Sequence, residues 1–179
     1  MFSACQNENP VTSDSLLKIS TLEADVPPGQ LTEEEEDGLI HMRLEEKVAR
    51  DVYIFLGDLY NHQTFLSIQL SEQRHMDAMK KLLIKYNIED PVTDDTPGVF
   101  SDPVFQSLYD AFILQGQASL NEAFIVGKTI EELDITDLEY QLTFVDNPDI
   151  IKVYTNLLAA SGSHLSAFIK NINSDNRIP

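Results

Sequence analysis

Apolar residues recur at helical spacing along most of this chain, and turn residues divide the pattern into segments. Residues at i, i+3, i+4 and i+7 of a helix share one face, so this spacing predicts amphipathic helices rather than strands. We expect four long helices, over about residues 32–60, 64–86, 119–144 and 147–172. The short turns within each half of this series favour two antiparallel hairpins, which together form an all-α four-helix bundle.

Capping signals support the expected helix starts. Thr32 with Glu35, and Ser119 with Glu122, match the capping box, in which each side chain bonds the backbone N–H of the other residue. Thr64 is expected to cap the second helix. Each signal comes shortly before an apolar-periodic segment, so together they define the beginnings of three helices.

The crossover between the two hairpins carries an extra element. Residues 90–102 contain Pro91 and Pro97 and are predicted to form an irregular loop. Asp102 followed by a proline is typical of a helix start. We therefore expect a short helix in the crossover, ending near Gln115.

The length and composition fit a single helical domain. The chain has 179 residues, 42% of them hydrophobic, which suffices for one domain with a sizeable core. Residues 1–30 lack apolar periodicity and are predicted to be a disordered tail or linker. The bundle domain is expected over residues 31–174, with a short tail over residues 175–179.

The chain is strongly acidic, with a formal net charge of −18. Nucleic-acid binding needs clustered lysine and arginine, so this charge excludes a nucleic-acid partner. Acidic surfaces attract cations, and most of these charges are expected to form a solvated exterior. The acids that bear on function are therefore the few on apolar helix faces.

Cys5 is the single cysteine of the chain, which excludes an intramolecular disulfide and a cysteine-based zinc site. The start, Met1 to Gln6, resembles the end of a bacterial lipoprotein signal, in which a cysteine after small residues becomes lipidated. Cys5 is then a lipid anchor, and the protein belongs to the cell envelope, in the periplasm or outer membrane. An ordinary disordered tail, with a cytoplasmic protein, is the other interpretation, and both stay open.

The segment expected to form the second helix places two ionisable residues inside its apolar stripe. Phe65, Ile68 and Met79 mark this stripe, and Glu72 and His75 fall in the middle of it. A charged Glu and a His carry a large free-energy penalty in an apolar core unless a partner satisfies them. A shared metal ion is one interpretation, and a buried structural histidine is the other.

The other long segments also place polar residues on inward faces. Glu46 lies in the stripe of the first helix, with Glu45 at the edge of a second apolar row as the alternative. Glu131 and Asp134 share the apolar face of the third helix, and His164 stands among the apolar residues of the fourth. Each lies about 11 to 18 residues from the turn of its own hairpin, so at about 1.5 Å rise per residue these side chains meet near one level.

Other ionisable residues of these segments are interpreted without a site. Glu132, Asp137 and Glu139 point away from the apolar face of the third helix and are expected to be solvated. His41 is interpreted as a surface residue and His62 as a turn residue. The predicted site is therefore confined to the inward positions.

The inward residues resemble motifs of the ferritin-like superfamily. Glu46, Ala49 and Tyr53 fit the first-helix pattern Glu-x-x-Ala-x-x-x-Tyr of ferritins, bacterioferritins and rubrerythrins, and Glu72 and His75 match their second-helix pattern Glu-x-x-His. The similarity to one family is carried by four runs in order, residues 45–53, 71–76, 130–138 and 163–165. Together these runs look like family 2202 of the domains of unknown function. The resemblance covers about residues 31–172 and implies a ferritin-like four-helix bundle.

This resemblance also implies a non-haem metal site. Carried over by position, the implied ligands are Glu46, Glu72, His75, Glu131 and His164. Carboxylate and imidazole ligands suit iron, which we expect as the cofactor, and also manganese or zinc. Tyr53 or Tyr60 is expected to hydrogen-bond a ligand. With iron bound, redox activity toward Fe(II), oxygen or peroxide follows, although the ferritin-like class by itself names no substrate.

One position departs from the ferritin pattern. The second Glu-x-x-His motif requires Glu where this chain has Ser161, three residues before His164. Asp134 is a replacement acid from the third helix, which would retain the four carboxylates and two histidines of a di-metal site. A single-metal site, with Ser161 holding a water or making a hydrogen bond to a metal ligand, is the alternative.

A metal-free protein is the second hypothesis. In it the inward acids pair with His75, His164 and Arg50 in a buried polar network. The chain is then a helical binding or structural module, lipid-anchored if Cys5 is modified. Hydrolase chemistry is not expected, because no glycine-flanked serine occupies a strand-to-helix turn.

Overall fold

Helices account for all of the regular structure that the computed structural model describes, which covers residues 30–175. These residues form five α-helices and no strand: α1 (Glu33–Tyr60), α2 (Gln63–Lys85), α3 (Pro103–Gly116), α4 (Leu120–Gln141) and α5 (Pro148–Asp175). The prediction of an all-α fold is confirmed, and so is that of a short helix in the crossover. All five helices belong to one compact unit that begins at Leu31.

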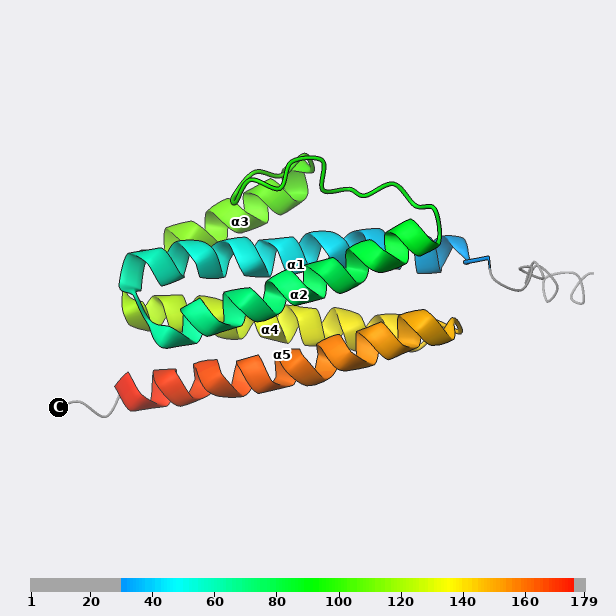
Figure 1. The fold of residues 1–179 in the computed structure, drawn as a ribbon. Helices are drawn as coiled ribbons and strands as arrows, with labels where there is room; N and C mark the ends of the chain where they lie inside the picture. Colours follow the sequence, from blue (N-terminus) through cyan, green and yellow to red (C-terminus); the bar gives the residue numbers. More distant parts are fainter. Residues whose placement is uncertain (1–29, 176–179) are drawn as a thin grey trace, which may run out of the picture. The chain divides into compact units, whose positions relative to one another are not determined.

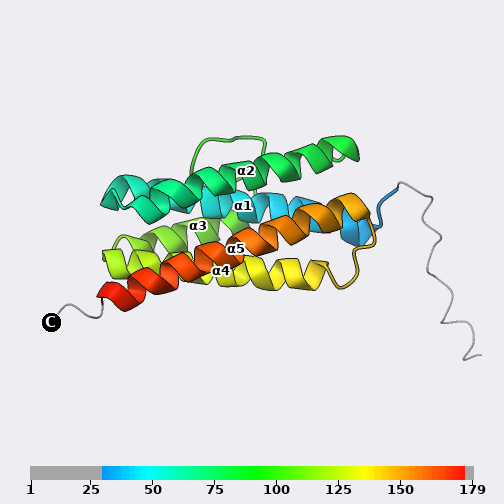
Figure 2. The same cartoon turned by 60° about the horizontal axis from the view of Figure 1, so that its bottom comes forward.

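The four long helices lie side by side as two hairpins. α1 packs along α2 and α4 packs along α5, and the hairpins meet through contacts of α1 with α4 and of α2 with α5. Figure 2 shows the same pairing from a second direction. The crossover passes along the outer side of α1, and α3 then packs on α1 and α4. One side of the α1–α4 pair is therefore covered in part by α3.

The predicted N-cap of α1 is confirmed, whereas the predicted N-cap of α2 is wrong. Thr32 caps α1 as expected: its hydroxyl accepts from the Glu35 N–H, and the Glu35 carboxylate accepts from the Thr32 N–H, each at 3.1 Å. The cap of α2 is His62 and not Thr64, since His62 Nδ1 accepts from the Thr64 N–H at 3.3 Å. The prediction was wrong because Asn61 adopts a left-handed conformation, φ 48°, which reverses the chain at once.

The ends of α4 and α5 also differ from the expected boundaries. α4 ends at Gln141, earlier than the expected Phe144, and α5 runs on to Asp175. The connection between them is held by Glu35 of α1, whose Oε1 accepts from the backbone N–H groups of residues 146 and 147 at 3.1 Å. This contact from a distant helix fixes the connection as a loop.

Two predictions concern residues outside the described part of the chain. The disordered tail over residues 1–30 and the lipid anchor at Cys5 fall almost wholly within residues 1–29, and most of the tail over residues 175–179 also lies outside. Among the described helices, none combines the length and the apolar character needed to span a membrane.

The core consists of two apolar clusters with a polar layer between them. The cluster nearer the α1–α2 turn includes Tyr53, Phe65, Phe124 and Phe168. The cluster at the other end of the helices includes Leu39, Met42, Met79, Leu83, Leu138 and Leu157. Full burial of one such side chain stabilises the fold by about 1.5–3 kcal/mol. Each cluster draws on all four long helices, so both ends of the polar layer are closed by packed side chains.

In the first cluster, Phe168 approaches the backbone of α4 so closely that only a glycine fits at position 127. A Cβ on Gly127 of α4 would lie 2.4 Å from the ring of Phe168 on α5. Phe168 is fully buried, and its ring centroid lies 5.3 Å from that of Tyr53. Gly127 therefore lets Phe168 support Tyr53, which reaches the polar layer.

A buried ion-pair network fastens the crossover loop to α1. Lys47 Nζ lies 2.5 Å from Asp51 Oδ2, and Arg50 donates to Asp51 Oδ1 at 2.8 Å. Asp51 also accepts from the backbone N–H of Gly98 at 2.9 Å, and Lys47 donates to the carbonyl oxygen of Thr96 at 3.1 Å. Asp51 is thus the acceptor that joins both cations to the loop.

We expect Asp51→Asn to destabilise the protein by about 3–5 kcal/mol, because it leaves the buried Lys47 ammonium without its carboxylate. Asp58→Asn, the same change at an exposed position of α1, is the matched control and should cost no more than about 0.5 kcal/mol. Urea denaturation followed by circular dichroism measures both. Equal unfolding midpoints for the two variants would contradict the role assigned to Asp51.

Candidate metal centre

The polar layer brings the predicted site residues together as two triads that share one member. The first triad is Glu46 of α1 with Glu72 and His75 of α2, and the second is Glu72 with Glu131 of α4 and His164 of α5. In each triad the candidate ligand atoms lie within 4.8 Å of one another. The convergence of the two hairpins on one level is thus present in the structure, while the metal itself stays a prediction.

In the first triad His75 faces both acids through one ring nitrogen. His75 Nδ1 lies 2.6 Å from Glu72 Oε2 and 3.2 Å from Glu46 Oε2. The other ring nitrogen, Nε2, lies 3.5 Å from the hydroxyl of Ser71. A partner on the second nitrogen fixes the ring orientation and the tautomer of a metal-binding histidine, so the sequence Ser71-Glu72-x-x-His75 sets the ring on one turn of α2.

In the second triad His164 takes the corresponding place. His164 Nδ1 lies 2.8 Å from Glu72 Oε1 and 3.5 Å from Glu131 Oε2. The Tyr53 hydroxyl donates to Glu131 Oε1 at 2.7 Å, as expected for one of the two tyrosines. Tyr60 instead donates to a backbone carbonyl oxygen near the end of α3, because it lies two helical turns farther along α1.

Asp134 and Ser161 explain the departure from the ferritin pattern. The Ser161 hydroxyl donates to Asp134 Oδ2, and Ser161 is fully buried in the layer. Asp134 belongs to neither triad, but its charge raises the pKa of Glu46, so it lies near the first triad. The residue in the place of the expected Glu therefore orients an acid supplied by α4.

Two buried carboxylate oxygens of the layer, Glu46 Oε1 and Asp134 Oδ1, have no hydrogen-bond partner. Glu72 Oε1 and His164 Nδ1 lie 2.8 Å apart and contact one another. Buried polar atoms in native proteins are nearly always paired, and carboxylate oxygens and imidazole nitrogens are the ligand atoms that bind divalent transition metals. By this criterion the residues present fit a metal ion.

Burial and mutual repulsion dominate the electrostatics of the acids. Burial, followed by the charge of Asp134, raises the pKa of Glu46 well above its usual value. Burial, followed by the charge of Glu72, raises the pKa of Glu131 to about 7. The pKa of Asp134 is also raised well above normal, chiefly by burial and then by the charge of Glu131. These acids therefore do not all ionise at the same time unless a cation lies beside them.

The histidines supply that charge in the metal-free protein. Burial opposes their protonation, but the neighbouring carboxylates outweigh it and raise the pKa of His75 to about 11 and that of His164 to about 9. Burial also opposes ionisation of Glu72, yet hydrogen bonds from both histidines lower its pKa to about 2. Glu72 is thus the one acid of the layer that both cations stabilise as a carboxylate.

Glu46 and its alternative, Glu45, belong to different clusters of side chains. Glu45 Oε1 lies 3.3 Å from His41 Nε2, and His41 Nε2 lies 3.5 Å from Asp137 Oδ2. These three side chains form a further carboxylate–histidine cluster outside the layer, which the sequence interpretation missed. The i, i+4 spacing of His41 and Glu45 was the available signal, whereas the contribution of Asp137 from another helix was not visible.

Arg50 takes no part in the layer. It pairs with Asp51 and with Asp95 of the crossover loop, each at 2.8 Å. The expectation that Arg50 neutralises the inward acids was therefore wrong: its side chain leaves α1 on the side of the loop. Among the described residues, the histidines are the cations paired with the acids of the layer.

These features define the class of protein: a helical protein whose core holds a buried carboxylate–histidine layer. The chain belongs to the family described as "Uncharacterized protein domain (DUF2202)", which residues 35–178 match. The resemblance to family 2202 of the domains of unknown function, found in the sequence, is thereby confirmed.

Comparison with known proteins identifies one relative in both sequence and structure. The uncharacterized protein MJ0754 of Methanocaldococcus jannaschii is 50% identical over 149 residues, which make up 83% of this chain and 80% of the relative. The crystal structure of the hypothetical protein MJ0754 from Methanococcus jannaschii DSM 2661 aligns with a TM-score of 0.81 at 48% identity, over 86% of this chain and 87% of that chain. The helical arrangement described above is therefore similar to that of a solved relative.

We expect metal-free protein to lose stability, by on the order of a few kcal/mol, as the pH rises from about 5 to about 9. The pKa values of Glu46, Glu131, Asp134 and both histidines are raised on folding. In this interval the folded protein therefore binds more protons than the unfolded chain, so raising the pH favours unfolding. Glu72, with its lowered pKa, opposes this trend only in more acidic solution.

Bound metal should reverse this dependence, because ligands must lose their protons to bind. The increase in unfolding temperature on adding Zn²⁺ should therefore be larger near pH 8 than near pH 6. Calorimetry of chelator-treated and Zn²⁺-loaded protein at both pH values measures the two trends. A metal-free stability that is flat or rises with pH would contradict the electrostatic account.

Proposed function

We propose that this protein is a ferritin-like four-helix bundle that binds a pair of divalent metal ions, with iron as the physiological metal, and carries out redox chemistry. One observation supports a pair rather than a single ion. Glu72 belongs to both triads, with Oε2 beside His75 and Oε1 beside His164. A carboxylate with one oxygen in each triad is suited to bridge two ions.

Each ion then has its own terminal ligands. Glu46 and His75 would hold the first ion, Glu131 and His164 would hold the second, and Glu72 would be shared between them. Asp134, oriented by Ser161, is the fourth carboxylate and offers its unpaired Oδ1. The set retains the four acids and two histidines of di-iron bundles, with one acid moved from α5 to α4.

The surrounding residues position these ligands and keep water away. Tyr53 holds Glu131 by its hydroxyl proton at 2.7 Å, and Ser71 faces the outer nitrogen of His75. The two apolar clusters close both ends of the layer, which strengthens every electrostatic interaction inside it. Iron, when bound to such a set of carboxylates and imidazoles, supplies electrons to oxygen or peroxide.

A metal-free helical module is the second candidate. The contact of 2.6 Å between His75 and Glu72 favours it, because histidine and carboxylate here satisfy one another directly. This alternative leaves Glu46 Oε1 and Asp134 Oδ1 unpaired in the core, at a cost of about 1–3 kcal/mol for each such group. The metal-binding proposal gives those atoms a partner and is preferred for that reason.

We expect the purified full chain, loaded with Fe(II) without oxygen and desalted, to retain about two metal ions per chain. The variant Glu72→Ala, His75→Ala should retain almost none, because it removes the bridge and one terminal ligand. Plasma mass spectrometry measures the content, and circular dichroism verifies that the helices persist.

The matched control is Glu132→Ala, Glu139→Ala, which removes two exposed acids of α4 and should leave the metal content unchanged. Equal metal content in the Glu72, His75 variant and the wild type would overturn the proposal. So would a folded wild type that retains no metal.

Single substitutions distinguish two ions from one. Glu46→Ala and Glu131→Ala each remove a terminal ligand of a different ion, so each should lower the content by about one ion per chain. Glu72→Ala should lower it by about two ions, since the bridge serves both. Loss of all metal from every one of these variants, starting from a single ion in the wild type, would instead establish a single-metal site.

A further inference from the structure

An acidic hollow opens at the surface between α1, α4 and the start of α3. Its volume is about 540 Å³. The acids that line it come from all three helices or their caps: Glu34, Asp37, Asp102 and Asp137. Concentrated negative charge in a concave surface raises the local concentration of cations. The hollow is therefore a place where divalent ions gather.

The carboxylate–histidine cluster of His41, Glu45 and Asp137 stands at this hollow, and two of its members line the wall. His41 Nε2 lies 3.3 Å from Glu45 Oε1 and 3.5 Å from Asp137 Oδ2. The three candidate ligand atoms lie within 4.8 Å of one another. One imidazole and two carboxylates are a sufficient ligand set for a partly hydrated divalent ion.

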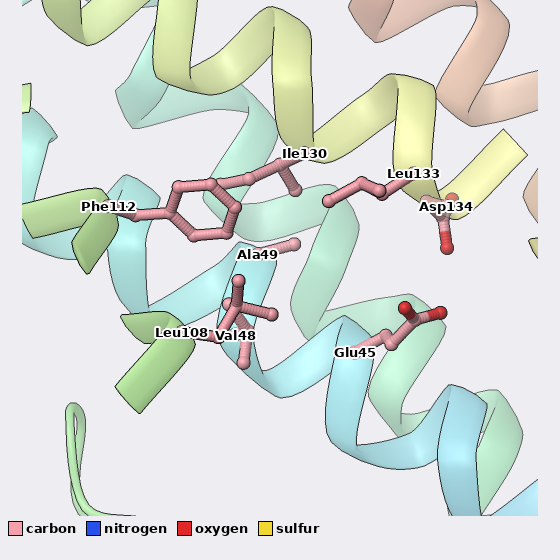
Figure 3. Close-up of a pocket in the computed structure, with 8 residues that line it drawn as sticks. All are labelled: Glu45, Val48, Ala49, Leu108, Phe112, Ile130, Leu133 and Asp134. Atoms are coloured by element: carbon pink, nitrogen blue, oxygen red, sulfur yellow. The ribbon is translucent and has the colours of Figure 1, made fainter. Parts of the chain in front are cut away.

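A second observation points inward from this cluster. Glu45 and Asp134 line a small pocket between α1 and α4, and their carboxylates point toward one another in Figure 3. Glu45 Oε2 and Asp134 Oδ1 are buried without a hydrogen-bond partner, and Asp134 is only 8% exposed. The pocket has a volume of about 20 Å³, enough for one water-sized occupant. A buried acid of the inner layer, with one oxygen unpaired, thus lines the same pocket as an acid of the outer cluster.

We propose that His41, Glu45 and Asp137 form a second, outer divalent-cation site, and that Glu45 and Asp134 pass ions from it to the inner layer. Glu45 connects the two sites: its Oε1 contacts His41, its Oε2 is buried without a hydrogen-bond partner, and its side chain lines the pocket that Asp134 also lines. An ion would then move from a Glu45 oxygen to an Asp134 oxygen, the two acids of a pocket whose other lining residues are apolar. The delivery role rests on the proposed function, whereas the outer site itself does not.

The outer site is weaker than the inner layer because it has fewer ligands and greater exposure. The side chain of His41 is 44% exposed and that of Asp137 37%, so water competes for the ion. Because the outer site is weaker than the inner layer, the difference in affinity favours the transfer of ions from the outer site to the inner layer. Its loss should therefore affect the rate of loading rather than the final content of the inner layer.

Two measurements with Zn²⁺ alone test this inference on the full chain. Calorimetric titration of the wild type should show tight binding followed by one weaker event, and His41→Ala, Asp137→Asn should lack the weaker event. Stopped-flow loading from a zinc-loaded chromophoric indicator should be slower in this variant by about tenfold, the lower end of what a focused field contributes to association. The affinity of the tight event should be unchanged.

Asp137→Asn alone and Glu139→Gln form the matched pair, since each removes one negative charge from α4 and Glu139 is exposed outside the hollow. Asp137→Asn should slow loading and Glu139→Gln should not. Equal rates in this pair, a weaker event that persists in the double variant, or loss of the tight event there would each overturn the inference. If the proposed inner centre is wrong, the tight event is absent from the wild type while the weaker event still depends on Asp137.

Discussion

The repulsion between buried carboxylates governs the middle of this protein. Glu46, Glu131 and Asp134 each have a raised pKa, because burial removes them from water and they face the charges of neighbouring carboxylates, Glu72 among them. An unpaired ion in such surroundings costs several kcal/mol, so the layer persists only with partners. His75 and His164 provide them in the metal-free protein, and the packed clusters on both sides supply the stability that holds these charges in place.

Helical periodicity was sufficient to predict the all-α fold class and to place the six ionisable residues of the polar layer on inward helix faces, whereas Ser161 was found through the family resemblance. Glu72 and His75 stood out because each lies one or two turns from apolar residues of the same face. Asp134 was predicted as a replacement for an acid missing at Ser161, and the Ser161 hydroxyl donates a hydrogen bond to Asp134. Periodicity gives the direction in which a side chain leaves its helix, so it could predict which residues face the interior.

Contacts between distant segments were beyond that reasoning. The Lys47–Asp51 pair holds a loop more than forty residues away, and nothing in the local sequence distinguishes it from an exposed i, i+4 pair. Asp137 joined His41 only because α4 packs on α1. Glu45 and Glu46 were alternative candidates for the ligand from the first helix. Successive residues differ by about 100° around a helix, so Glu46 faces the polar layer and Glu45 faces the cluster of His41 and Asp137.

Two acids of the layer belong to the same helix, and this affects how the layer can move. Glu131 and Asp134 stand on α4, about one turn apart, while α5 contributes His164 and the hydroxyl of Ser161. A small rotation of α4 about its axis would swing both acids in the same sense, and a rotation of α5 would act on the acids only through the Ser161 hydroxyl and the His164 ring. The four carboxylates thus stand on three helices, and the fourth helix contacts them through a hydroxyl and an imidazole.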